Sequence, residues 1–184
     1  MSAATKKALA TGLVFGLMAL FVPGTAAAQE RQTEISGGWS YAHQTDVSIP
    51  AGWYASGGRY VNDWFGIVAQ ASGHYKTISE SGVDVKTNFH IFGAGPRFAY
   101  RRYPRLTPFV DLLIGAGRAS AASAFGSNSN ESVTNFAYKS NFGLAINNRS
   151  GLLGLRVAVG DYGVRSDARW TNDSSFEAGV VIRR

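Results

Sequence analysis

Hydrophobic residues alternate with small or polar residues in a series of short segments of this chain. The clearest example is residues 64–76, WFGIVAQASGHYK. Every second position from Phe65 to Tyr75 is aromatic, aliphatic or small, whereas the positions between them are mostly small or polar. A period of two residues is that of a β-strand, whose successive side chains point to opposite faces of the sheet. Residues 64–76 are therefore predicted to form a strand with one apolar face that begins and ends on an aromatic side chain.

The same alternation recurs along the chain, and no helical period follows residue 28. Eight strands of about 9–15 residues are predicted, long enough to cross a bilayer at a tilt. The connections after the second, fourth and sixth strands are tight, and those after the third, fifth and seventh are longer and polar. This pattern predicts an all-β fold, an eight-stranded antiparallel up-and-down transmembrane β-barrel with two unlike ends. The predicted strands are residues 34–42, 51–61, 64–76, 87–101, 107–119, 133–146, 152–161 and 174–184.

Three places interrupt the regular pattern. In residues 51–61, Gly57-Gly58 is a candidate site for a β-bulge, and we expect Trp53 to face outward. Pro96 lies inside the fourth predicted strand and has no N–H to donate, so a bulge or local bend is expected there. Residues 43–50 are predicted to be a short polar link, which is short for the end that otherwise carries the longer loops.

The face opposite the apolar one carries charged residues on six of the predicted strands. A soluble barrel needs an apolar interior and a polar exterior, whereas a transmembrane barrel has the reverse arrangement. The pattern favours a transmembrane barrel whose charged side chains pair inside the lumen, because an unpaired buried charge is costly. The alternative is a sandwich with the charged face in solvent and the apolar face as its core. The predicted lumen charge network is Glu34, Arg97, Arg101, Asp111, Lys139, Arg156, Glu177 and Arg183.

Aromatic residues lie near the predicted ends of the apolar face. Trp and Tyr favour the membrane–water interface, because an apolar ring and a polar group can each meet a suitable solvent there. We therefore expect them to anchor the barrel at the two interfaces. They are Trp39, Tyr41, Trp64, Tyr75, Tyr100 and Trp170.

The first 28 residues have the layout of a secretory signal peptide. Lys6 and Lys7 precede an uncharged apolar run, and Ala26-Ala27-Ala28 supplies the small residues of a cleavage site. Residues 29–184 are then one β-barrel domain, and an uncleaved membrane anchor is the alternative for residues 1–28. The chain has no cysteine, which excludes disulfides and a lipoprotein anchor. Without the two signal lysines, 16 basic and 12 acidic residues leave a net charge of +4, too mild to indicate a nucleic-acid partner.

No catalytic or cofactor-binding motif is apparent. His43, His74 and His90 lack the spacing of a metal site and are predicted to be solvated residues near the outer rim. Ser72 and His74 share a strand face, but residues two apart stand about 7 Å from each other, too far for a catalytic pair. The sequence therefore predicts a non-enzymatic protein without cofactor or metal.

Four stretches resemble the small eight-stranded outer-membrane β-barrel family (OmpA/OmpX-type, porin-like). They are GWYASGGRYVNDWFGIVAQASGHYK, VDVKTNFHIFGAGPRFAYR, LTPFVDLLIGAGRAS and SFEAGVVIRR, and the likeness covers essentially all of residues 29–184. The resemblance implies a monomer in the outer membrane of a Gram-negative-type bacterial envelope, with both termini on the periplasmic side. Its implied partners are outer-membrane lipid, lipopolysaccharide and the barrel-assembly machinery. Members usually end on an aromatic residue, whereas this chain ends on Arg184.

Three functions are compatible with these features. The first is a barrel with a plugged lumen that acts in envelope integrity or in surface interaction through its loops, because eight strands leave room only for side chains. The second is a narrow gated porin-like channel that opens when Arg97, Arg156, Asp111 and Glu177 rearrange. The third is a soluble periplasmic ligand-binding barrel. The sequence does not identify a surface ligand.

Overall fold

The computed structural model describes residues 33–44, 47–49, 52–80, 83–103, 105–123, 131–166 and 169–184. The predicted signal peptide, residues 1–28, lies outside the described residues. No helix of the described part of the chain is long and apolar enough to cross a membrane. The predicted domain is described from Thr33 onward.

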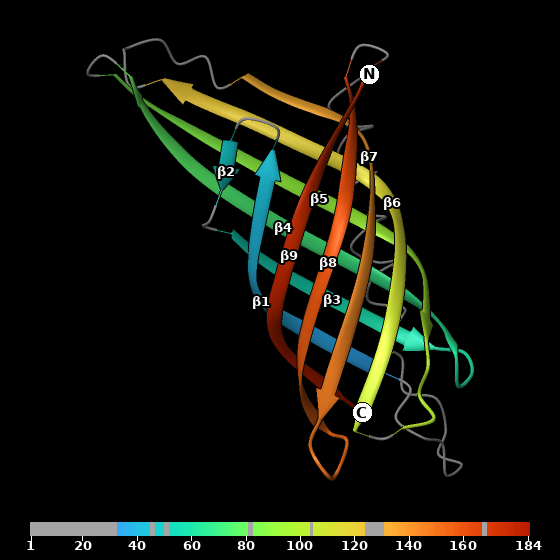
Figure 1. Ribbon diagram of the computed structural model, residues 1–184. Helices are drawn as coiled ribbons and strands as arrows, with labels where there is room; N and C mark the ends of the chain where they lie inside the picture. Colours follow the sequence, from blue (N-terminus) through green and yellow to red (C-terminus); the bar gives the residue numbers. More distant parts are fainter. Residues whose placement is uncertain are drawn as a thin grey trace.

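The described residues form one antiparallel sheet of nine strands, in which the short β2 pairs with β1 alone. The other eight strands pair with their neighbours in sequence order, and β1 also pairs with β9, so the sheet closes into a barrel (Figure 1). This confirms the predicted eight-stranded up-and-down topology. The strands are β1 Thr33–Gln44, β2 Val47–Ile49, β3 Gly52–Tyr60, β4 Phe65–Glu80, β5 Val83–Ala99, β6 Leu106–Ser123, β7 Glu131–Asn147, β8 Leu153–Ser166 and β9 Arg169–Arg183.

The barrel closes through a ladder between β1 and β9 that runs from Glu34↔Arg183 to His43↔Ser174. Beyond the last pair, Thr33 and Arg184 exchange two backbone hydrogen bonds of 2.9 and 2.8 Å. The first and last described residues therefore lie side by side at one end of the barrel. The tight turns between β3 and β4, β5 and β6, and β7 and β8 lie at the same end (Figure 1). We call it the turn end, and the opposite end the loop end.

Neither of the two candidate sites holds a β-bulge. The ladders of β3 with β1 and β4 run through Gly57 and Gly58 without a slip in register, so there is no bulge at this position. At Pro96, the ladder between β5 and β6 omits Gly95 and Pro96, but the pairs on either side keep the same register. The missing proline N–H thus interrupts the hydrogen bonding locally without inserting an extra residue.

The first connection also differs from the prediction. Residues 47–49 are not part of a simple link but form β2, which folds back on the loop end of β1 with Ala42 opposite Ile49. Ile49 is buried, because it pairs with the inward-facing Ala42 and packs in the same cluster. Residues 47–49, Val-Ser-Ile, alternate, but three residues before a proline are too few to establish a period of two.

The predicted strands were too short at the loop end. The ladder of β4 with β5 continues to Glu80↔Val83, and that of β8 with β9 continues to Ser166↔Arg169. Most of the polar segments predicted as long loops are therefore paired strand. Beyond the apolar belt, the sequence no longer alternates between apolar and polar, so the period-two signal ends before the ladder does.

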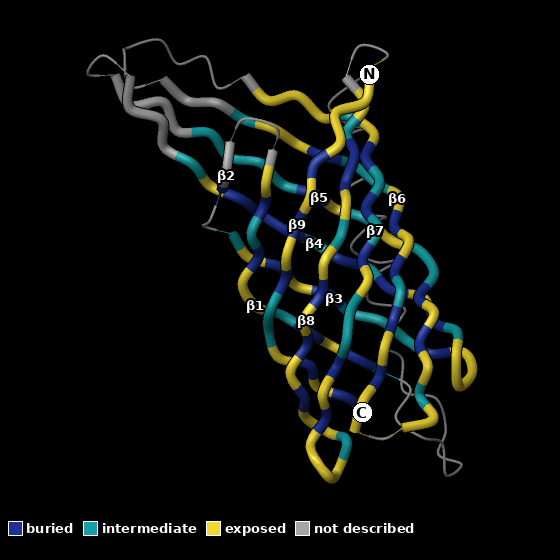
Figure 2. Tube along the Cα trace, viewed as in Figure 1, coloured by how far each residue is buried: buried dark blue, intermediate teal, exposed yellow. Residues whose placement is uncertain are grey.

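Burial alternates along every strand of the barrel, as Figure 2 shows for the whole wall. In β4, Val68, Gln70 and Ser72 are buried, whereas Ile67 is 44% exposed. In β3, Tyr54 is buried and Trp53 is 37% exposed, so the predicted outward facing of Trp53 is confirmed. The apolar face is therefore the outer wall, and the polar and charged face lines the lumen. This arrangement rules out the sandwich, whose apolar face would be its core.

A matched pair of arginine substitutions tests whether this wall meets lipid. Ile67 lies on the outer wall of β4, between Trp64 and Tyr75. Ile67→Arg should lower the free energy of unfolding by about 2 kcal/mol or more, because a charge on the lipid face is costly away from the interfaces. Val61→Arg, at the turn end of the same hairpin, should cost less than about 1 kcal/mol. Urea unfolding in phospholipid vesicles measures both. Equal costs would contradict a lipid-facing wall.

Candidate functional site: a charged lumen

Asp111 of β6 is the centre of the lumen, and it is fully buried. Arg97, opposite it on β5, donates from Nε to Oδ1 at 2.6 Å and from Nη2 to Oδ2 at 2.8 Å. Arg156 of β8 donates from Nη2 to Oδ2 at 3.0 Å. The carboxylate thus receives three charge-assisted hydrogen bonds from two guanidinium groups, which is how a buried charge becomes tolerable.

Arg156 connects this centre to the opposite wall. Its Nη1 donates to Ser36 Oγ at 2.9 Å and to Ser56 Oγ at 3.0 Å, and the two hydroxyls also share a hydrogen bond of 2.7 Å. Ser36 lies on β1 and Ser56 on β3, so one fully buried guanidinium crosses the lumen from β8. A single side chain therefore occupies most of the narrow cross-section at this level.

Glu177 of β9 forms a second centre. Lys139 Nζ donates to its Oε1 at 2.5 Å and Gln70 Nε2 donates to the same oxygen at 2.6 Å. Asn141 Nδ2 donates to Gln70 Oε1 at 3.3 Å. The Nη2 atom of Arg156 lies 3.9 Å from Glu177 Oε2, which links the two centres.

The remaining predicted lumen charges lie toward the turn end. Arg97 Nη1 also donates to Glu34 Oε1, and Arg183 Nε donates to Glu34 Oε2 at 2.8 Å. Arg101 is half-buried, with its guanidinium 4.3 Å from the centroid of the Tyr60 ring. Seven of the eight residues predicted as the network therefore lie in one chain of ion pairs, and Arg101 lies on an aromatic ring below them.

An aromatic ring supports the network from the turn end. The guanidinium carbons of Arg97 and Arg156 lie 4.8 and 4.5 Å from the centroid of Phe109, a distance that allows a cation–π contact with each. The ring lies directly over Gly143, where an added Cβ would meet Phe109 Cζ at 2.2 Å. Phe109 also packs with Tyr60, Ala99 and Ala158 in a buried cluster that fills this end of the lumen.

A second apolar cluster fills the lumen near the loop end. Ile49 packs there with Ala42, Ile91, Ala137 and Tyr162, all buried. Because Ile49 comes from β2, the folded-back first connection supplies part of this cap. We call these five residues the apolar cap. The Asp111 and Glu177 centres thus form a charged layer between the apolar cap and the Phe109 cluster, and further charges continue beside that cluster to the turn end.

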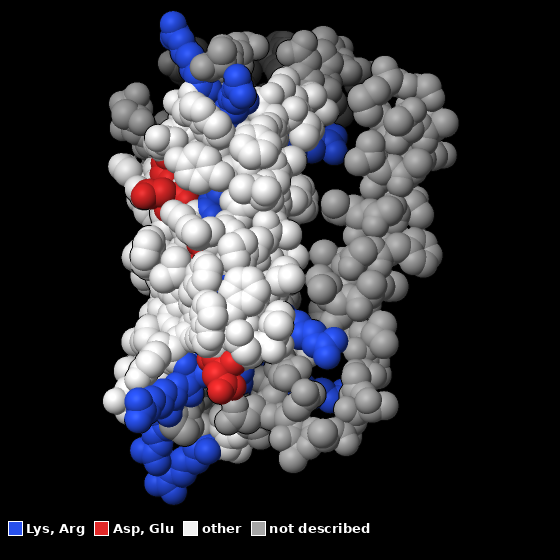
Figure 3. Space-filling view, turned by 90° about the vertical axis from the view of Figure 1, so that its right-hand side faces the viewer, with Lys and Arg blue, Asp and Glu red and all other residues white. Residues whose placement is uncertain are grey.

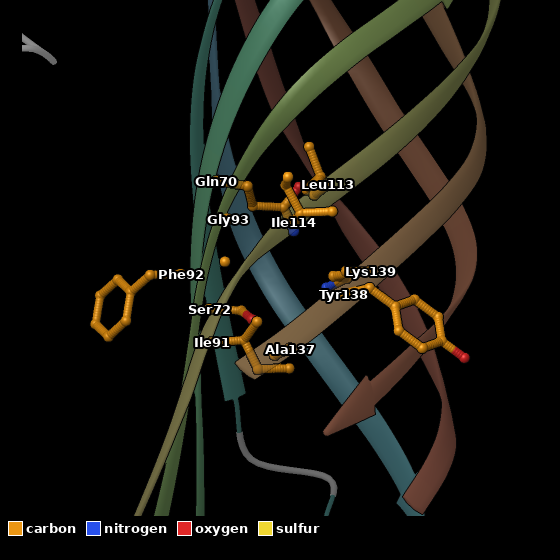
Figure 4. Close-up of a pocket in the computed structure, with 11 residues that line it drawn as sticks. Gln70, Ser72, Ile91, Phe92, Gly93, Leu113, Ile114, Ala137, Tyr138 and Lys139 are labelled. Atoms are coloured by element: carbon orange, nitrogen blue, oxygen red, sulfur yellow. The ribbon is translucent and has the colours of Figure 1, made fainter. Parts of the chain in front are cut away.

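A narrow pocket lies between the charged layer and the apolar cap. Figure 4 shows Gln70, Ser72, Leu113 and Lys139 around it, and the side chains of Phe92 and Tyr138 pointing away from the barrel interior. The pocket is too narrow to admit a water molecule. The polar pattern of the inner face therefore does not correspond to a water-filled channel at this level.

The predicted position of one histidine was wrong. His74 is fully buried in the lumen, with Nε2 3.0 Å from Ser40 Oγ. It lies on the inward face of β4, and because this strand continues to Glu80, His74 is below the rim and not at it. His90 is half-exposed on the outer wall, where its Nε2 lies 3.3 Å from Tyr75 Oη. His43 is exposed near the end of β1. Among the described residues, no group of three or more His, Cys, Asp or Glu side chains is placed to hold a metal ion.

The predicted interfacial aromatics all lie on the outer wall, in two sets. Trp64 and Tyr100 are exposed near the turn end. The rings of Trp64 and Phe98 stack there, with their centroids 6.1 Å apart. The other four lie nearer the loop end, where Trp53 Nε1 also donates to Tyr75 Oη at 3.0 Å. These four are Trp39, Tyr41, Tyr75 and Trp170.

The sequence analysis missed several residues that complete the lumen. Gln70, Ser36 and Ser56 hydrogen-bond the charged groups, and Asp173 is buried near the loop end, outside the predicted strand. With Asp173, the buried acids and bases among the described side chains balance at four each. The inward phase of each strand is the signal that could have identified the two serines and Gln70 as lumen residues. The sequence analysis selected lumen residues by their charge. The uncharged partners are buried as deeply as the acids and bases.

Comparisons with solved structures place this fold among small outer-membrane barrels. No family model and no curated protein matches the chain. The attachment invasion locus protein Ail of Yersinia pestis, solved with the heparin analogue sucrose octasulfate, is 20% identical with a TM-score of 0.59, and the match covers 85% of this chain and 100% of Ail. Neisserial surface protein A gives 16% identity, a TM-score of 0.62 and coverage of 86% and 100%. The N-terminal β-barrel domain of Pseudomonas aeruginosa OprF is 11% identical with a TM-score of 0.53, and the match covers 85% of this chain and 100% of that domain.

The chain is therefore an eight-stranded antiparallel β-barrel with the fold of small transmembrane barrels. Its outer wall is apolar and its lumen is polar, as that fold requires in a bilayer. The resemblance identified from the sequence is confirmed at the level of the fold.

Substituting Asp111 tests how far the network depends on it. Asp111→Asn removes the charge that Arg97 and Arg156 share. It should lower the free energy of unfolding by about 3–5 kcal/mol, because two buried guanidinium groups then lose one of their carboxylate partners. Asp63→Asn, at an exposed turn position, should change it by less than about 0.5 kcal/mol. Urea titration followed by the shift in gel mobility between folded and unfolded barrel measures both. A small effect of Asp111→Asn would show that the network contributes little to stability.

Proposed function

We propose that this protein is a non-enzymatic barrel of the bacterial outer membrane, with a plugged lumen and a role in envelope integrity or in surface interaction at its loop end. The main support is the sealed lumen. Arg156 crosses the barrel between β8 and the serines of β1 and β3, and apolar clusters fill the lumen on both sides of it. The fold, the signal-peptide layout of residues 1–28 and the apolar outer wall support the location.

A gated narrow channel is the second candidate. It is favoured by one weak link in the charged layer, the 3.9 Å separation between Arg156 Nη2 and Glu177 Oε2, which joins its two centres. A path between the centres requires the stronger contacts of Asp111 to break as well. A third candidate, the soluble periplasmic barrel, conflicts with the exposed apolar wall, which water would surround.

Electrical recording separates the plugged barrel from the channel. Purified protein in a planar bilayer should show no stable single-channel steps, because described side chains occupy the lumen at the level of Arg156 and in both apolar clusters. A shift in mobility between boiled and unboiled samples on a gel verifies that the protein is folded. Reproducible conductance steps from folded protein would establish the gated channel instead.

The loop end offers a basic surface for interaction with an anionic polymer. Arg118 of β6, Arg165 of β8 and Arg169 of β9 are exposed there. Ail has been solved with a sulfated heparin analogue, and it shares this fold. Guanidinium groups bind sulfate and phosphate oxygens through charge-assisted hydrogen bonds, so these arginines support a sulfated or phosphorylated polymer as the ligand.

Binding of labelled heparin to intact cells tests this surface. Cells that display the wild-type protein should bind heparin, and Arg118→Gln/Arg165→Gln/Arg169→Gln should reduce binding several-fold, because each arginine contributes a charge-assisted contact. Arg102→Gln/Arg105→Gln/Arg149→Gln, with the same charge change at the turn end, should leave it unaltered. Equal binding by wild type and the loop-end variant would rule out these arginines as the ligand site.

A further inference from the structure

The outer wall carries two apolar grooves in line with each other on β5, β6 and β7. The first, of about 440 Å³, is lined near the turn end by Trp64, Phe98, Val110 and Phe142. The second, of about 330 Å³, lies further from that end and is lined by residues that include Pro96 and Tyr138. The register places them in succession, because Phe98 pairs with Val110 and Ala94 with Ile114, four residues further along β5 and β6. We call the two together the wall groove.

The wall groove coincides with the break in the ladder. The pairs of Gly95 and Pro96 with β6 are missing, and both residues line the second groove. The missing pairs therefore lie at the second groove, where Gly95 has no side chain and leaves the wall thin. A groove of this shape and lining suits a single acyl chain.

Three exposed arginines lie at the turn end of the wall groove. Arg102 and Arg105 are in the turn between β5 and β6, which joins the groove residues Tyr100 and Pro108. Arg149 is in the neighbouring turn between β7 and β8, and the two turns are connected because Asn147 N donates to Arg105 O at 2.9 Å. We call these three residues the arginine rim.

The arginine rim is available for a ligand. None of the ion pairs among the described residues includes Arg102, Arg105 or Arg149. Figure 3 shows basic side chains at both ends of the molecule, with an acidic group beside those at the lower end, and a mostly uncharged wall between the ends. Trp64, Tyr100 and Tyr103 are exposed at the same end, as expected where the wall leaves the hydrocarbon region.

From this juxtaposition we infer that the arginine rim and the wall groove form a binding site for an anionic phospholipid of the periplasmic leaflet, with its phosphate at the rim and one acyl chain in the groove. The assignment rests on the proposed function, which places the turn end at the periplasmic face. Guanidinium groups bind phosphate in a bidentate manner, and a basic group near an anionic surface favours association. A zwitterionic lipid gains less from the rim, because its own ammonium group offsets the phosphate.

Spin-labelled lipids in phosphatidylcholine vesicles test the site. The wild-type barrel should immobilise spin-labelled phosphatidylglycerol in preference to spin-labelled phosphatidylcholine. Arg102→Gln/Arg105→Gln/Arg149→Gln should reduce that preference by a factor of about five or more, since one arginine near an anionic surface contributes roughly that much. Arg118→Gln/Arg165→Gln/Arg169→Gln has the same charge change at the loop end and should retain the preference.

A second variant tests the groove separately from charge. Val110→Trp places an indole in the first groove and should weaken the immobilisation of phosphatidylglycerol while the rim stays intact. Val157→Trp makes the same change on the outer wall of β8, outside the wall groove, and should have no such effect.

Three outcomes would overturn the assignment. The first is a wild-type barrel with no lipid preference, and the second is a rim variant that keeps the preference. The third is a rim variant that loses binding to isolated peptidoglycan while its lipid signal is unchanged, which would make the rim a site for the cell-wall polymer and not for lipid. A barrel that inserts into the vesicles and shows a heat-dependent gel shift but has no lipid preference refutes only this site. A wild-type chain that stays soluble without vesicles refutes the proposed function itself.

Discussion

The structure depends on the pairing of charges in a space where water is excluded. Asp111 has no exposed surface, yet it is acceptable because Arg97 holds it with two hydrogen bonds and Arg156 with a third. The same two cations lie against Phe109, which excludes water from the turn-end side. Removing Asp111, Arg97 or Arg156 takes a partner from a buried charge that the lumen cannot solvate. The network is therefore a packed layer of the barrel interior, comparable to the apolar core of a soluble protein.

This layer explains why the wall is apolar on the outside. Eight strands enclose a lumen that side chains fill, so the interior can be polar only if its charges balance and interlock. Once the polar residues are inside, the outward phase of each strand is left to apolar residues such as Ile67 and Val157. The polar lumen and the apolar outer wall are thus two consequences of one alternating pattern. A lipid bilayer is the environment in which a barrel with this pattern is stable.

Period-two alternation was enough to predict the barrel, its strand order and the facing of each strand. It was not enough for the loop end, where β4 and β8 continue as paired strands through polar sequence. Nor was it enough for β2, whose three residues are too few to define a period. The inward phase of their strands placed Asp111 and Glu177 in the lumen. It did not identify the partner of either carboxylate. Partners such as Gln70 come from strands more than one hundred residues apart in the chain, and only closure of the barrel brings them together.

The same network bears on whether the lumen conducts. To open a path past Asp111, the side chain of Arg97 or Arg156 must leave the carboxylate while both groups stay in the barrel. Separating a buried pair costs about 3–5 kcal/mol, which corresponds to an open population of roughly one molecule in a few hundred or fewer. The apolar cap at the loop end would have to open in addition, because Ile49 and Tyr162 fill the lumen above the charged layer. Because the carboxylate contacts and the apolar cap would both have to open, a conducting state should be rarer than the loss of either one alone.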